Sequence, residues 1–144
     1  MKTIRFKRRW PQGEMFSSGR LTLLADRAVS GDLELEGPRG TYLLFSGGVR
    51  FHCRFRAGDL VRVGERLAMR VAGVRCERAG DLGEADWLRA GVTGSGDVWR
   101  VGGCHGGTWP TARDAGLALV ARELGAGERD WLVLYEVEAW SRIG

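Results

Sequence analysis

Apolar and polar side chains alternate over several short stretches of the chain, which is the pattern of half-buried β-strands. "KTIRFKRRW" at the N-terminus places Ile4 and Phe6 on one face and basic residues on the other. "TYLLFSGGVRFHCRF" predicts two strands that turn at Gly47 and Gly48. Further strands are predicted in "RLTLLAD" and in "DWLVLYEVEAW". The segment "GDLVRVGERLAMRVAGVRCER" predicts a strand, a turn and a long strand. The segment between the second and third strands, "SGDLELEGPRG", carries glycine and proline and is predicted to be a loop.

The apolar spacing becomes helical in two places. "DLGEADWLRAG" has Asp81 three residues before Glu84, which predicts a capping box at a helix start, and Gly91 at its end. "TARDAGLALVARELG" predicts an amphipathic helix after Pro110 that Gly125 closes. A helical turn is expected in "PQGEMFSSG", and the glycine-rich "VTGSGDVWRVGGCHGG" is expected to leave the core as an excursion, with Trp99 and Trp109 anchoring it.

These elements predict an α+β fold, a small mixed β-sheet or barrel flanked by a few short helices. The 144 residues suffice for one hydrophobic core, so residues 1–144 are expected to form a single domain. No apolar run approaches the roughly 20 residues that cross a bilayer, so no membrane partner is expected and the cytoplasm is the default location. The three cysteines are widely spaced and lack a CxxC pattern, which argues against disulfides and a structural zinc site, and no cofactor is predicted.

The positive charge consists almost entirely of arginine. The net charge is +4, and Lys2 and Lys7 are the only lysines. Arginine suits bidentate contacts with phosphates and base edges, so the charge favours a nucleic-acid partner. An arginine-rich composition also follows from a GC-rich genome, and the charge alone leaves both readings open.

The basic face of the N-terminal strand is a candidate nucleic-acid contact. Charge there combines with an aromatic ring that could stack on a base, through Arg5, Lys7, Arg9 and Trp10. The alternative is an edge strand that its charges protect from aggregation. A second series in alternating register, Arg50, Arg54 and Arg56, could extend the same surface.

Four segments in this order resemble the ASCH family of the PUA-like superfamily. They are "SSGRLTLLADR", "AGDLVRVGERLAMRVAGVRCERAGDLGEADWLRAGV", "ARDAGLALVARELG" and "WLVLYEVE". The resemblance implies a compact β-barrel associated with RNA and modified nucleosides. It covers roughly half of the chain, and none of the four segments is diagnostic alone.

The resemblance also implies where reactive groups would stand. In an amidohydrolase branch of this family, a lysine, a threonine and a glutamate hydrolyse acetylated cytidine; the aligned positions here hold Leu21, Leu24 and a residue at or near Ala90. None of these side chains can titrate. The polar residues that remain and could hold a phosphate or base edge are Gly19, Arg20, Thr22 and Arg27. A hairpin with merely solvated arginines is the alternative.

Two functions therefore stay open on the sequence. One is a non-catalytic module that binds RNA or a nucleotide. The other is an enzyme acting on RNA or modified nucleosides that recruits another group, such as Asp26 or Glu84. Cys104 and His105 are weak candidates for a nucleophile and base, because adjacent residues of an extended loop point apart and no third group orients them. The ligand and the oligomeric state are not predicted.

Overall fold

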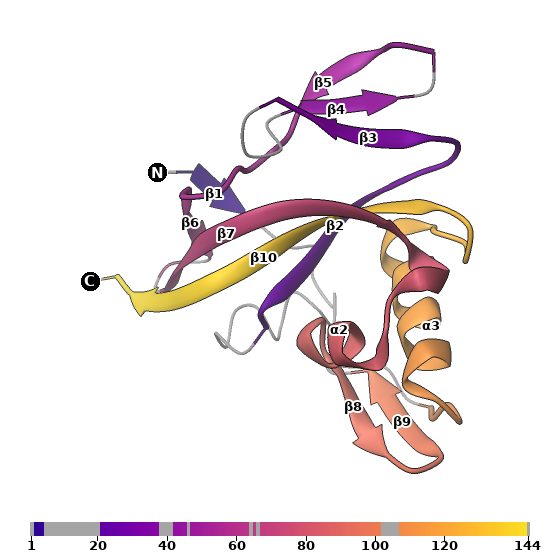
Figure 1. Cartoon of the computed structure of the whole chain (residues 1–144). Coiled ribbons are helices and arrows are strands. Elements are labelled where there is room, and N and C mark those ends of the chain that lie inside the picture. The colour runs from indigo at the N-terminus through magenta and orange to yellow at the C-terminus, as the bar shows by residue number, and fades with distance from the viewer. Residues whose placement is uncertain are drawn as a thin grey trace.

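The computed structural model describes residues 2–4, 21–37, 42–45, 47–63, 65, 67–101 and 107–143. Strands dominate: a large curled sheet forms a half-barrel, a small sheet lies on one side of it, and two helices lie on the other (Figure 1). The predicted α+β class is confirmed.

In the part of the chain described, five strands build the large sheet in the order β1-β6-β7-β10-β2. Their bounds are Lys2–Ile4 for β1, Leu23–Val29 for β2, Leu60–Val63 for β6, Leu67–Arg78 for β7 and Trp131–Arg142 for β10. β1 runs parallel to β6, and the other neighbours are antiparallel. β7 and β10 are each 12 residues long, so they form the curved spine on which the other elements pack.

The small sheet is an antiparallel meander of β3 (Leu33–Glu36), β4 (Tyr42–Phe45) and β5 (Arg50–His52). The turn between β4 and β5 contains Gly47 and Gly48, both at positive φ, as the sequence predicts. The expected loop over 30–40 is wrong at its centre, where β3 forms. The alternation of Leu33 and Leu35 with glutamates supports this strand, and the loop signals lie on both sides of it.

The α-helices within the described residues are α2 (Glu84–Arg89) and α3 (Ala112–Leu124), and the hairpin β8 (Val92–Ser95) to β9 (Val98–Val101) lies beside them. Thr111 caps α3 by accepting a hydrogen bond from the Asp114 amide, and Gly125 closes it at φ 66°. The expected capping box of α2 is wrong. Asp81 belongs to a 3-10 turn over Ala79–Asp81, and Gly83 is the N-cap without a side-chain hydrogen bond.

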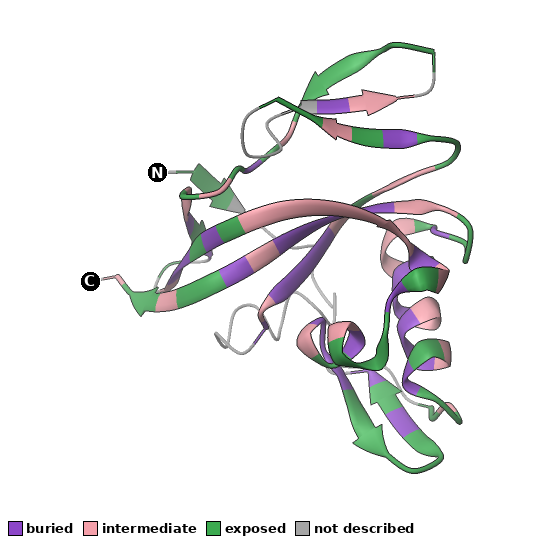
Figure 2. Ribbon diagram, in the orientation of Figure 1, coloured by how far each residue is buried: buried purple, intermediate pink, exposed green. Residues whose placement is uncertain are grey.

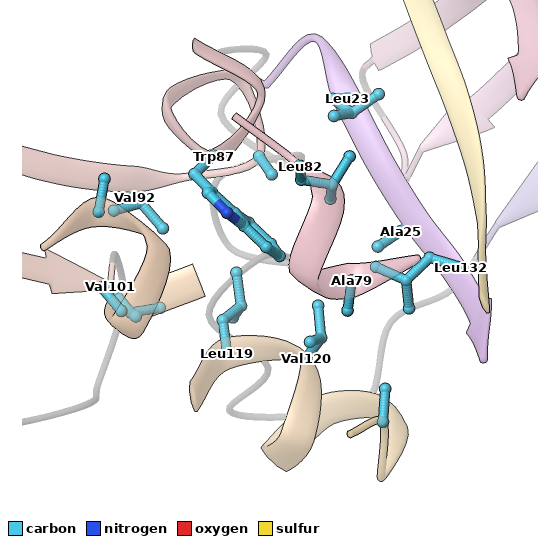
Figure 3. Close-up of a cluster of buried hydrophobic side chains, with 14 of the residues drawn as sticks. Leu23, Ala25, Ala79, Leu82, Trp87, Val92, Val101, Leu119, Val120 and Leu132 are labelled. Atoms are coloured by element: carbon cyan, nitrogen blue, oxygen red, sulfur yellow. The ribbon is translucent and has the colours of Figure 1, made fainter. Parts of the chain in front are cut away.

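The large sheet separates two hydrophobic clusters, visible as buried bands on its strands (Figure 2). Leu23, Ala25, Leu132 and Leu134 face the helices, while Leu24, Val133 and Tyr135 face the small sheet. On the helix side, Trp87 is fully buried between α2 and α3 (Figure 3). Trp99 and Trp109 exchange backbone hydrogen bonds of 2.9 and 2.8 Å, which is consistent with the expected anchoring of the glycine-rich segment.

Several predicted features lie outside the described residues. They are the turn expected over 11–19, the candidates Arg5, Lys7, Arg9, Trp10, Gly19 and Arg20, and the pair Cys104 and His105. Within the described ranges, no helix combines the length and the apolar character needed to span a bilayer.

Candidate functional site

An irregularity in β2 determines which way its charged residues point. The pairing of β2 with β10 shifts between Val133 and Leu134, so that Asp26 has no opposite residue. Strict alternation from Leu23 and Ala25 would send Arg27 to the helix side. The bulge instead pairs Arg27 with Val133, on the face toward the small sheet.

Arg27 lies against two aromatic rings of the small sheet. Its guanidinium carbon is 5.3 Å from the ring centre of Phe45 and 5.8 Å from that of Phe51. The two rings meet edge to face, with centres 5.2 Å apart. The distances from the Arg27 guanidinium carbon to the two ring centres both fall within the range of cation–π attraction. Phe51 keeps 47% of its surface exposed, so part of this residue stays open to solvent beside the charge.

Arg54 lies in the connection between β5 and β6, next to the bulged residue Asp26. Its Nη1 donates a hydrogen bond of 3.0 Å to Oδ1 of Asp26, and its guanidinium carbon lies 5.1 Å from the ring centre of Phe55. The Asp26 carboxylate thus connects the two arginines, because it precedes one in the chain and binds the other. We call Arg27, Phe45, Phe51 and Arg54 the arginine–phenylalanine face.

Asp26 is a largely buried carboxyl group beside this face. Its side chain is only 12% exposed, and burial raises the pKa of Asp26 above its ordinary value, an effect that Arg54 and Arg27 oppose. Burial also raises the pKa of Tyr135, whose hydroxyl lies nearby and accepts hydrogen bonds from the Arg54 and Phe55 amides. The phenol is therefore neutral and serves as a fixed support under the loop that carries Arg54.

Two other candidates from the sequence do not join this face. Arg50 pairs with Leu44 in the β4–β5 ladder, so it lies on the opposite surface of the small sheet from Phe51, where its Nε is 3.2 Å from Glu36. Thr22 faces α2: its hydroxyl accepts a hydrogen bond of 3.0 Å from Nε of Arg89. Thr22 and Arg27 therefore belong to different sides of the sheet.

Thr22 is part of an ion-pair network that fastens α2 to the large sheet. Arg75 of β7 binds Asp86 of α2 at 2.6 Å, and Arg89 of α2 binds Glu136 of β10. Arg75 also lies 3.3 Å from Glu136, which closes the network. Every charge in it has an opposite partner, so this cluster is explained by holding α2 in place.

The positions aligned with the amidohydrolase residues hold buried apolar side chains. Leu21 and Leu24 pack in the cluster under the small sheet, whereas Ala90 packs in the cluster under the helices. Glu84 is exposed at the start of α2, at the rim of a shallow pocket of about 340 Å³ that Trp99 and Pro110 also line. Of the two carboxyls considered as replacements, only Asp26 is desolvated beside arginines.

Metal binding finds no support in the described part of the chain, where no group of three potential ligands comes together. Burial raises the pKa of the Cys53 thiol, and burial with the nearby Cys53 raises that of Cys76 to about 12. Neither cysteine is thus a thiolate at neutral pH, so neither is an activated nucleophile.

Phe45 and Phe51 are not among the candidates predicted from the sequence, because apolar residues in a strand are normally assigned to the core. The only available signal was the arginine spacing in "GGVRFHCRF", which brackets Phe51 with charges. The role of Asp26 as the partner of Arg54 depends on a contact between distant segments, and no local pattern indicates it.

Comparison with known proteins adds no assignment: neither a family model, nor a curated protein, nor a solved structure matches the chain.

Proposed function

We propose that the chain is an RNA- or nucleotide-binding module of the ASCH/PUA-like type, and that it binds through the arginine–phenylalanine face. The observation that carries the proposal is the position of the Arg27 guanidinium over Phe45 and Phe51, with Phe51 half exposed. Proteins that bind single-stranded nucleic acids use this combination, in which an arginine attracts the backbone and an aromatic ring stacks on a base.

The charge of Arg27 remains available for a phosphate. No carboxylate lies within ion-pair distance of its guanidinium among the described residues, and its aromatic contacts leave the hydrogen-bond donors unspent. A phosphate would therefore meet a charged guanidinium whose position the two rings restrict. The order of the four family-like segments and the curled sheet support the assignment to the ASCH/PUA-like type.

The first test is a titration with labelled single-stranded RNA, duplex RNA and single-stranded DNA at two salt concentrations. We expect the single strands to bind best, because a duplex does not offer an unstacked base to Phe51. Arg27→Ala should weaken binding and reduce the salt slope by about 0.7 log unit, and Phe51→Ala should weaken it about fivefold or more with little change in slope.

Arg122→Ala and Leu88→Ala are the matched controls. The first removes an exposed arginine of α3, and the second removes an exposed apolar side chain of α2, both on the helix side of the sheet. If all four variants bind alike, or if no nucleic acid binds at all, the proposed function is wrong.

The enzyme alternative is favoured by one observation, the raised pKa of Asp26 beside two arginines. Such a carboxyl is a candidate general acid or base. The same titration mixtures examined for cleavage products test it: products that form with the natural chain and not with Asp26→Asn would place hydrolysis ahead of binding alone.

A further inference from the structure

We propose that Arg54, held in place by Asp26, determines base specificity at this face and reads the O6 and N7 acceptors of an unpaired guanine. This inference rests on the proposed function and adds a ligand class to it.

Arg54 is fixed from several directions although its side chain is 45% exposed. Its backbone amide donates to the Tyr135 hydroxyl at 3.0 Å, and its carbonyl accepts from Nζ of Lys2 at 3.2 Å. Its guanidinium is held at Nη1 by Asp26, and its central carbon lies over the buried ring of Phe55. An exposed arginine usually retains its rotamer freedom, so these contacts point to a guanidinium that is organised in advance of binding.

The contacts of Arg54 leave one edge of the guanidinium available. Asp26 takes Nη1, while Nε and Nη2 have no hydrogen-bond partner among the residues that the structure describes. These two groups form a planar pair of donors. Such a pair matches two acceptors side by side, as on the O6/N7 edge of guanine or on a phosphate.

The charge balance favours the base edge over the phosphate. The carboxylate of Asp26 opposes the field of Arg54, which weakens the attraction for an anion. Hydrogen bonds to a neutral base edge depend on donor geometry and lose less. Arg27, which makes no ion pair with a carboxylate of the described residues, is left for the phosphate, and Phe51, three residues before Arg54, supplies the stacking surface.

The test measures the affinity of a ten-nucleotide uridine RNA that carries guanosine, adenosine, cytidine or 7-deazaguanosine at one central position. We expect guanosine to bind about fivefold tighter or more than the other three, because adenosine and cytidine lack the O6/N7 pair of acceptors and 7-deazaguanosine lacks N7. Arg54→Lys keeps the charge and loses the planar pair of donors, so it should abolish the guanosine preference. Arg122→Lys is the matched control, and thermal melting verifies that each variant is folded.

Asp26→Asn provides an independent variant. It should raise the affinity for all four RNAs at low salt and shrink the guanosine preference, because Arg54 then carries an uncompensated charge and a weaker anchor. Equal affinity for all four RNAs, with binding that still depends on Arg27 and Phe51, would overturn the inference and leave the proposed function standing. A guanosine preference that survives Arg54→Lys would also overturn it, and failure of every RNA to bind would overturn both.

Discussion

The hydroxyl of Tyr135 accepts a hydrogen bond from the backbone amide of Arg54 across 3.0 Å, which joins the buried centre of β10 to the loop between β5 and β6. The same oxygen lies 3.4 Å from the amide of Phe55, and the Tyr135 and Phe55 rings pack edge to face with centres 5.1 Å apart. One buried phenol thereby stabilises the fold and positions the candidate site.

Tyr135→Phe should therefore destabilise the protein by about 1–3 kcal/mol, because it leaves two backbone amides without their acceptor and preserves the ring packing. Urea unfolding measures the loss. We also expect the affinity for uridine RNA to fall less than in Arg27→Ala, since the phenol positions Arg54 rather than the phosphate contact. A stability within about 0.5 kcal/mol of the natural chain would show that water replaces the hydroxyl.

The sequence predicted the strands of this region, but it did not indicate which face of the sheet Arg27 occupies. Hydrophobic alternation is local, and for this reason β2, β4, β5, β6, β7 and β10 were expected at nearly their observed places. The bulge at Asp26 arises from pairing with β10, far along the chain, and it reverses the face of every later residue of β2. Arg27 was therefore a reasonable candidate, but its aromatic partners were unpredictable.

Two predictions about secondary structure were wrong: the loop where β3 forms and the capping box of α2. Leu33 and Leu35 alternate over only four residues between glycines, so the loop signals outweighed a strand that forms because β4 pairs with it. Asp81 and Glu84 have capping-box spacing, but the chain turns through Ala79–Asp81 first, and the helix begins after Gly83. Thr22, Arg89 and Glu136 come from three segments, and no spacing rule connects them.

Gly116 of α3 provides a sharp test of the helix packing. Alanine normally stabilises a helix relative to glycine by about 1 kcal/mol. Here a Cβ atom at Gly116 would overlap the ring of Trp87, which lies directly on the helix (Figure 3). Gly116→Ala should therefore destabilise the protein by about 1–3 kcal/mol in urea unfolding.

Gly73→Ala in β7 is the control for Gly116→Ala, because a Cβ atom there meets no atom within 4 Å. It should leave the free energy of unfolding nearly unchanged. Equal or greater stability of Gly116→Ala would mean that Trp87 does not pack on α3 in this way.

The network between α2 and the large sheet predicts energetic coupling between Thr22 and Arg89. Thr22→Val removes the hydroxyl that accepts from Nε of Arg89 and should cost about 1 kcal/mol. Arg89→Met should cost more, about 1–3 kcal/mol, because it also removes the partner of Glu136. The double variant should lose less than the sum, with a coupling of about 0.5 kcal/mol or more, as measured by urea unfolding. Strict additivity would contradict the hydrogen bond.

The contact between Asp59 and Lys2 predicts that the attachment of the N-terminal strand β1 depends on pH. Partial burial acts to raise the pKa of Asp59, but its contacts outweigh this effect and hold the pKa below its ordinary value. Asp59 accepts hydrogen bonds from Nζ of Lys2 at 2.7 Å and from the Arg56 amide at 3.0 Å, and the charges of both residues act in the same direction. A lowered pKa means that the folded state binds this proton less readily than the unfolded chain. The contribution of Asp59 to stability is therefore present above the unfolded pKa of about 4 and is lost as the pH falls through the folded pKa.

Asp59→Asn should accordingly destabilise the protein by about 1 kcal/mol at pH 7, and the difference from the natural chain should shrink as the pH falls below about 4. Thermal melting of both proteins at pH 7 and at a pH below about 4 measures this difference. Asp97→Asn, at an exposed position in the turn between β8 and β9, is the matched control and should show no such convergence. If the difference between Asp59→Asn and the natural chain is the same at both pH values, the carboxylate charge does not hold β1, and packing alone attaches the strand.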